Sequence, residues 1–284
     1  MPIIGAHVSS AGGVFNCFAN AQKIGAECLQ IFGASPQQWQ VKLPELATIE
    51  KFKAERKKSK INPVFLHASY LVNLGSPDNR IFYGSVKNLV EHYKIANSLG
   101  ADGLIFHTGS AKGGTKETAI SHVAKGIKLV LAEVKGKSAL ILENSSGGGD
   151  KIGVTIEEIG EICQAVDSPR LKICLDTAHG FEAGIFEKFS VEELDLFVKK
   201  CDKLFGWKNV VAMHINDSKT KHLSNHDRHA NIGEGYIGLE AFRNLALHKS
   251  FNKLPWILEV PGFDNNGPDR RNIEILSTLL TKTS

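Results

Sequence analysis

Short apolar runs of this 284-residue chain repeatedly end in a side chain that can bind a metal ion or carry a proton. Seven of these side chains lie at or next to the last position of a run: His7, His67, His107, Glu143, Asp176, His214 and Glu259. Imidazole and carboxylate ligands without thiolates suit zinc, manganese or iron. One such histidine has an ordinary structural explanation, but several buried carboxylates repel one another unless cations compensate them. The pattern therefore predicts a metal centre.

Two local spacings strengthen this interpretation. Asp176 and His179 are three residues apart where a predicted strand passes into a loop, close enough to face one cluster. Asp227 and His229 are two residues apart, so both side chains project from one side of an extended loop. Nine residues then become candidate ligands, which is more than two ions need: His67, His107, Glu143, Asp176, His179, His214, Asp227, His229 and Glu259.

The elements that must position these residues are eight predicted β-strands, which recur roughly every 35 residues. The expected strands are residues 3–8, 28–32, 64–67, 103–107, 139–143, 171–176, 210–215 and 256–260. Segments with helical periodicity separate them, at residues 43–58, 81–99, 117–134, 156–166, 191–205 and 239–247. Strands that alternate with helices predict an α/β fold with parallel strands and right-handed crossovers. Eight such units favour a closed (β/α)8 TIM barrel, in which all strand ends open on the face that carries the active site.

Composition is that of a globular protein, with 42% hydrophobic and 23% charged residues. We expect one domain over residues 1–284 and no membrane association, because no stretch approaches the roughly 20 apolar residues that cross a bilayer. The first residues lack the features of an export signal, which predicts a cytoplasmic protein, associated with the nucleoid if bacterial. The five cysteines are scattered, which argues against disulfides and thiolate zinc sites, and Cys174 in an apolar run is expected to be a small buried hydrophobe.

Several motifs together resemble the signatures of the endonuclease IV family. They are Gly5-Ala6-His7-Val8-Ser9, the segment from Leu66 to Gly75, Leu142-Glu143-Asn144, Leu175-Asp176-Thr177-Ala178-His179, the segment from Met213 to Lys219 followed by Asp227-Arg228-His229, and Gly233-Glu234-Gly235. The resemblance covers nearly the whole chain. It implies an apurinic/apyrimidinic endonuclease, built as a (β/α)8 barrel with a trinuclear zinc site.

The resemblance also implies a role for each ligand. His67, His107 and Glu143 would hold one zinc ion, and Glu143 would bridge to a second ion completed by Asp176, His214 and Glu259. His179, Asp227 and His229 would hold the third, with Mn²⁺ as an alternative metal at these sites. Glu143 is therefore the expected catalytic residue, and a metal-bound hydroxide would attack the phosphodiester 5′ to the abasic nucleotide and leave a 3′-hydroxyl. Three Zn²⁺ would raise the formal net charge of +4 by six, which favours an anionic substrate.

The expected partner is double-stranded DNA that contains abasic sites, bound by a monomer. By resemblance, the loop that carries Gln37 and the pair Tyr70 and Leu71 would wedge into the DNA, while Lys219 and Arg228 would contact phosphates. His7 has no place among the nine ligands and is expected to support a ligand or the phosphate.

Two residues depart from the family pattern. Gln37 replaces an inserting arginine, so we expect a shorter, uncharged inserting side chain and a different strength of DNA binding. Leu223 replaces a glycine, and it would be strained if that position needs a positive φ, so the loop that carries Asp227 could follow another path.

Two alternative functions stay open at this point. A divalent-metal sugar isomerase of a related barrel class would use the set Glu143, Asp176, His214 and Glu259, but it would leave the other five candidate ligands unexplained. A non-catalytic, metal-dependent DNA-binding protein would need no open coordination positions, and only a measurement of activity separates it from an enzyme.

Overall fold

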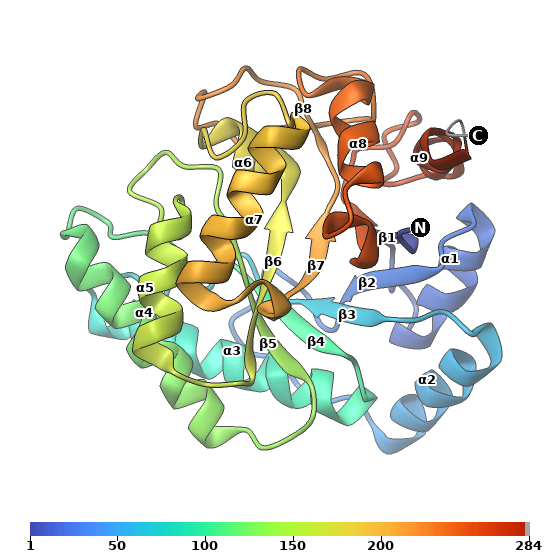
Figure 1. Ribbon diagram of the computed structural model, residues 1–284. Coiled ribbons are helices and arrows are strands. Elements are labelled where there is room, and N and C mark those ends of the chain that lie inside the picture. Colours follow the sequence, from blue (N-terminus) through green and yellow to red (C-terminus); the bar gives the residue numbers. More distant parts are fainter. Residues whose placement is uncertain (282–284) are drawn as a thin grey trace.

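The computed structural model describes residues 1–281, in which eight parallel strands close into a barrel (Figure 1). They are β1 (Ile4–His7), β2 (Cys28–Phe32), β3 (Val64–His67), β4 (Gly103–Phe106), β5 (Ala139–Glu143), β6 (Leu171–Asp176), β7 (Val210–His214) and β10 (Trp256–Leu258). Strand β10 pairs with β1 and closes the ring. The predicted TIM barrel and its eight strands are confirmed. The prediction of one domain over 1–284 stays a prediction, and its residues 282–284 lie outside the described residues.

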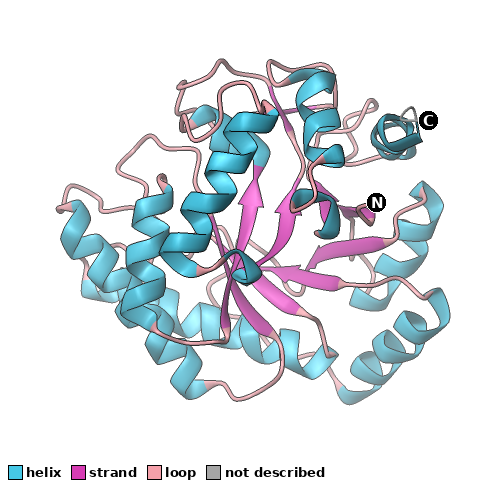
Figure 2. Cartoon of the chain, viewed as in Figure 1, coloured by secondary structure: helices cyan, strands magenta, loops and turns pink. Residues whose placement is uncertain are grey.

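Helices cover the outside of the barrel (Figure 2). All six predicted helices are present: α2 (Leu46–Ser59), α3 (Asn79–Leu99), α4 (Lys116–Glu133), α5 (Ile156–Val166), α7 (Val191–Phe205) and α8 (Gly238–Leu247). Four of them begin at a side-chain cap that accepts a backbone N–H of the first turn, provided by Asp78, Thr115, Thr155 and Ser190. These caps explain why the helices start where the sequence pattern places them.

Other elements were not predicted. They are α1 (Cys17–Ile24), α6 (Thr177–Glu182), α9 (Arg270–Thr281), the 3₁₀ turns η1 (Val14–Asn16), η2 (Trp207–Asn209) and η3 (Phe251–Lys253), and the strands β8 (Asp217–Ser218) and β9 (His229–Ala230). Strands β8 and β9 pair with each other in an antiparallel hairpin that follows β7. Among the described residues, no helix has both the length and the hydropathy to span a bilayer.

The barrel interior is layered, because alternate residues of each strand face inward. An apolar cluster contains one residue from each of seven strands: Cys28, Phe65, Ile105, Ile141, Cys174, Ala212 and Ile257. Two positions further along the chain, within these strands or directly after them, come Gln30, His67, His107, Glu143, Asp176, His214 and Glu259. The polar residues thus lie on an apolar floor at the carboxyl ends of the strands, and Cys174 is fully buried in that floor, as predicted.

The eighth strand, β1, contributes His7 to the polar layer and Gly5 to the floor. A Cβ atom at Gly5 would lie 1.9 Å from the carbonyl oxygen of Cys28 on β2. Only glycine therefore permits the close approach of β1 to β2 below His7. A second, larger apolar cluster fills the space between the strands and the surrounding helices.

Candidate metal centre

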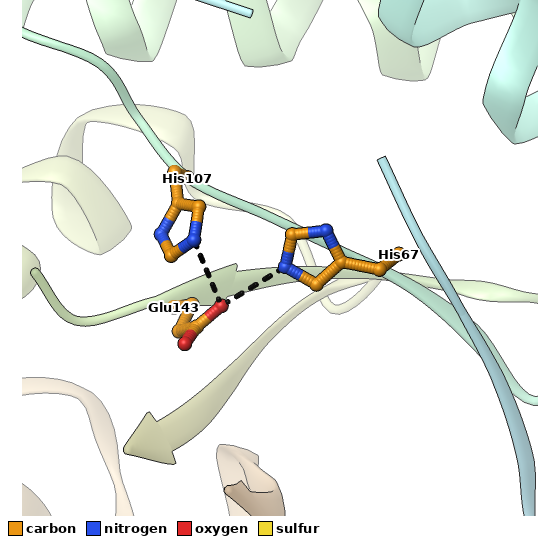
Figure 3. Close-up of side chains that lie close together, drawn as sticks. All are labelled: His67, His107 and Glu143. Carbon is orange, nitrogen blue, oxygen red and sulfur yellow. Dashed lines mark hydrogen bonds and ion pairs between the residues drawn. The ribbon is translucent and has the colours of Figure 1, made fainter. Parts of the chain in front are cut away.

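Glu143 lies at the centre of the polar layer, with a completely buried side chain at the end of β5. One carboxylate oxygen, Oε2, lies 3.2 Å from His67 Nε2 and 3.5 Å from His107 Nε2, and both rings point toward it (Figure 3). The other oxygen, Oε1, lies 2.9 Å from His214 Nδ1 and 3.3 Å from His179 Nδ1. One carboxylate is thus shared by four imidazole rings that come from different parts of the barrel.

A second group lies on the far side of Glu143. His214 Nδ1 is 3.2 Å from Glu259 Oε2 and 3.9 Å from Asp176 Oδ2. One donor atom from each of Glu143, Asp176, His214 and Glu259 can be chosen so that all lie within 4.8 Å of one another. Three carboxylates around one imidazole form a donor set that a divalent cation would neutralise.

The third group lies at the more open side of the layer, where the β8–β9 hairpin returns to the barrel. Asp176, His179 and His229 offer donor atoms within 4.8 Å of one another. The carboxylate of Asp227 lies between the two rings, with Oδ2 at 3.2 Å from His179 Nε2 and Oδ1 at 3.6 Å from His229 Nε2. The structure thus brings all nine predicted ligands together and adds Asp176 to the third group. The assignment of ligands to individual ions stays a prediction.

The electrostatics of the layer fit a cation. Burial by itself raises the pKa of Glu143, but the imidazoles of His107 and His214 more than offset this, so its pKa lies well below the usual range. Burial by itself lowers the pKa of His179, yet the carboxylates of Asp176 and Asp227 raise it well above the usual value. Glu143 therefore stays ionised, and its charge favours a cation at the mouth of the barrel.

The imidazole rings of His107 and His229 also fit a bound cation. Desolvation by burial lowers the pKa of His107 to about 4, which keeps a lone pair free on its ring. The Nε2 atom of His229 is buried and has no hydrogen-bond partner among residues 1–281, although it faces Asp227 and Asp176. A buried nitrogen without a partner is rare unless a ligand satisfies it. Imidazole nitrogens and carboxylate oxygens are the donors that zinc and similar cations bind.

Two asparagines that were quoted within the motifs, but given no role, hold these ligands in place. Asn144 Oδ1 accepts the backbone N–H of Asp176 at 2.6 Å. Asn216 Nδ2 donates to Asp176 Oδ2 at 2.6 Å, and its Oδ1 accepts the backbone N–H of Glu259 at 2.8 Å. Asp176 in turn accepts the N–H of His179 and caps α6, so the expected loop after β6 is a short helix. Sequence reasoning also missed Gln30, whose signal was a polar residue inside an otherwise apolar strand.

A cavity of about 550 Å³ opens above the layer, lined by His67, His107, His179, His229 and Glu259 among others. His7 lies on its wall, outside the three groups. Its Nδ1 is 2.9 Å from Gln30 Nε2 and 3.4 Å from Glu259 Oε1. The structure therefore places His7 next to a candidate ligand rather than among the ligands.

Two loops form one side of the cavity rim. Gln37 is exposed, Tyr70 is 63% exposed and lines the cavity, and Leu71 is half-buried. The backbone N–H of Tyr70 donates to Pro36 O at 3.2 Å, so the two loops lie side by side.

The loop that carries Gln37 is also fastened to helix α3. Asn88 Nδ2 donates to the backbone oxygens of Gln38 and Trp39. The Trp39 ring packs on Gly84, where a Cβ would lie 3.4 Å from the ring. Trp39 thus anchors the loop to the outside of the barrel and does not project into the cavity.

The opposite side of the rim is the β8–β9 hairpin. Lys219 and Arg228 are exposed there, and the N–H of Lys219 donates to Arg228 O at 2.8 Å. Leu223 has a φ of 60° and packs on Gly184, so the left-handed conformation suspected from the sequence is present. The hairpin nevertheless brings Asp227 to within 3.2 Å of His179, so leucine in place of glycine at position 223 does not move Asp227 away from the site.

The fold and these three donor groups define a metal-binding TIM barrel with its site at the carboxyl ends of the strands. The family model for xylose isomerase-like TIM barrels matches residues 18–279. The probable endonuclease 4 of Aquifex aeolicus (strain VF5) is 38% identical over 98% of both chains. That of Halothermothrix orenii is 36% identical over 96% of this chain and 98% of its own length.

A solved structure agrees with these relatives. Endonuclease IV from Thermus thermophilus superposes with a TM-score of 0.84 at 32% identity, over 98% of this chain and 99% of the other. The chain belongs to the endonuclease IV family, a family of nucleases that hydrolyse phosphodiesters. A D-tagatose 3-epimerase-like protein, with a TM-score of 0.72 at 19% identity, shares the fold alone.

Proposed function

We propose that this protein hydrolyses the phosphodiester on the 5′ side of an abasic site in double-stranded DNA and leaves a 3′-hydroxyl. The observation that carries the proposal is the set of three donor groups, two of which share Glu143, on the floor of a cavity in an endonuclease IV barrel. Nine side chains would hold three divalent ions, with zinc as the proposed metal because the donors are imidazoles and carboxylates. Bound there, the ions would supply an activated water and the positive charge that a phosphodiester transition state requires.

The chain's own residues would prepare the site for this reaction. Glu143 contacts four imidazole rings, so it would keep the first two groups at a fixed separation and act as the catalytic carboxylate. Asn144 and Asn216 hold Asp176, and through it they hold the junction between the second and third groups. Rigid support of this kind sets the geometry of a site before the substrate arrives.

The position of the site below the rim favours a damaged nucleotide. A phosphate reaches the floor of the cavity only if its nucleotide leaves the helix, and an abasic nucleotide has no base to unstack. Exposed Tyr70 and Gln37 on one side would enter the gap, with Leu71 behind them. Lys219 and Arg228 on the other side would bind backbone phosphates without reading the sequence. We also propose that the protein acts as a monomer and on DNA inside the cell.

A sugar isomerase is the main alternative for a barrel of this class. It would use the second group alone, which contains Glu143, Asp176, His214 and Glu259. The first and third groups would then have no role, although His67 and His179 are almost completely buried and face carboxylates. Burial of this many ionisable groups is costly unless each contributes to binding. The three groups together therefore favour the nuclease.

A comparison of two matched variants tests the proposal. Glu143→Gln keeps the shape of the shared carboxylate and removes its charge, whereas Asp102→Asn changes a carboxylate that accepts the Val64 N–H at the opposite end of the barrel. Each zinc-loaded protein is incubated with a duplex that contains one tetrahydrofuran abasic analogue, and bound metal is quantified. Incision is expected to fall by about 10³ or more in Glu143→Gln with loss of zinc, and to stay near the wild-type rate in Asp102→Asn. Equal incision by Glu143→Gln and wild type would contradict the proposal.

A further inference from the structure

Gln30 is the polar side chain that β2 contributes to the layer of candidate ligands. It is completely buried, although it is neither a candidate ligand nor part of any family motif noted above. We propose that Gln30 is a positioning residue: its amide accepts the Nε2–H of His214, so that Nδ1 is free to bind the cation that Glu143, Asp176 and Glu259 would hold. This inference deepens the proposed function, on which it rests for the presence of metal.

The contacts of Gln30 use its whole amide group. Its Nε2 lies 2.6 Å from Glu259 Oε1 and 2.9 Å from His7 Nδ1. Its Oε1 lies 2.8 Å from His214 Nε2. One side chain therefore joins residues at or next to the ends of β1, β7 and β10, which are 23, 184 and 229 positions away from it in the sequence.

The orientation of the amide follows from its neighbours. An ionised carboxylate only accepts hydrogen bonds, so the atom that faces Glu259 must be the amide nitrogen. The reverse orientation would press two oxygens together at the 2.6 Å separation. The carbonyl oxygen of Gln30 therefore faces His214, and because a carbonyl only accepts, His214 Nε2 must donate.

This donor role decides which nitrogen of His214 is free. With hydrogen on Nε2, the ring would offer the lone pair of Nδ1 to a cation beside Glu143 Oε1 and Glu259 Oε2, which lie 2.9 Å and 3.2 Å from Nδ1. Without a cation, these carboxylates only accept and would keep a proton on Nδ1. The opposite tautomer would present an N–H to the cluster and could not bind a cation. Histidines that bind metal generally donate their other ring N–H to an oxygen that fixes the tautomer and the ring orientation. Gln30 provides that oxygen here.

A purely structural role of Gln30 predicts a different effect of its replacement than a positioning role does. If Gln30 only filled space, its replacement would change stability and leave the zinc affinity alone. Gln30→Met is the test variant, since it has a similar length and no hydrogen-bonding group. Asn209→Leu is the matched control, because this amide also makes two hydrogen bonds, to Lys172 Nζ and Phe205 O, but lies directly before the opposite end of β7.

Two measurements without DNA decide the inference. Competition with a chromophoric chelator measures zinc affinity, and one zinc equivalent is expected to bind about 10 to 100 times more weakly in Gln30→Met than in wild type or Asn209→Leu. In ¹⁵N–¹H spectra of zinc-loaded protein labelled in its histidines, the His214 Nε2–H proton is expected to be shifted downfield by its hydrogen bond to Gln30 in wild type and Asn209→Leu, and to lose this shift in Gln30→Met.

An unchanged shift of the His214 Nε2–H proton in Gln30→Met, or an unchanged zinc affinity, would overturn the inference. An equal loss of affinity in Asn209→Leu would also overturn it, because the effect would then reflect general loosening of the barrel. Failure of the proposed function has a separate signature, namely wild-type protein that does not incise abasic DNA. The zinc affinity and the spectra of zinc-loaded protein decide the role of Gln30 in that case as well.

Discussion

His92 on helix α3 is a buried histidine outside the proposed site, and it makes the stability of the fold depend on pH. Its side chain is completely buried, and neither ring nitrogen has a hydrogen-bond partner among the described residues. Desolvation lowers the pKa of His92 to about 4, with a smaller contribution from the ring of His67. The replacement His92→Leu puts an apolar side chain of moderate size in this place and removes the titrating group.

The sign and the size of the effect follow from linkage. Because the pKa is lower in the folded protein than the roughly 6.5 of an unfolded chain, the unfolded state binds more protons between these two values. Stability is therefore complete above about pH 6.5 and is lost as the pH falls toward 4. For a shift from about 6.5 to about 4, the loss at pH 5 is about 2 kcal/mol in the free energy of unfolding.

Urea unfolding of metal-free wild-type protein and His92→Leu at pH 7.5 and pH 5 measures this term. Other titrating groups contribute to both proteins and cancel in the difference between them. Wild type is expected to lose about 2 kcal/mol more than His92→Leu over this interval. His122→Leu, on the neighbouring helix α4, serves as the control and keeps the wild-type loss. The same loss in wild type and His92→Leu would refute the reasoning.

Three further predictions concern the site. Removal of metal with a chelator is expected to abolish incision and to lower the melting temperature, because the carboxylates then stay buried without cations. Added zinc should restore incision and melting temperature. A metal-free protein that still cuts abasic DNA would contradict this prediction. Lys219→Ala is expected to weaken duplex binding equally for different sequences. It should also reduce the slope of the logarithm of the binding constant against the logarithm of the salt concentration by about 1, as measured by fluorescence anisotropy. An unchanged slope would exclude a phosphate contact of Lys219. Asn88→Ala removes the hydrogen bonds that hold the loop carrying Gln37, and it should raise KM for the abasic duplex by about tenfold with little change in kcat. A fall in kcat alone would show that this loop does not act in substrate binding.

Much of the architecture could be predicted from the sequence, because the signals that define it are local. Eight apolar runs with the length of strands, separated by amphipathic segments, leave few arrangements other than a barrel. Parallel strands bring their carboxyl ends to one face, so residues such as His67, Glu143 and Glu259 could be predicted to converge although they are far apart in the chain. The short helix α6 and the β8–β9 hairpin carried no comparable periodicity, and neither was predicted.

What the tertiary structure decided is how these residues contact one another. Contact between Gln30 and His214, which are 184 residues apart, depends on the tilt and register with which β1, β2, β7 and β10 close the barrel. The approach of Asp176 to His229 likewise depends on the return of the hairpin. Residue types and alternation along a strand determine which side chains face the interior, since that geometry belongs to the strand itself. Which donor atoms meet there is a property of the closed barrel, because it requires every strand to be in place at once.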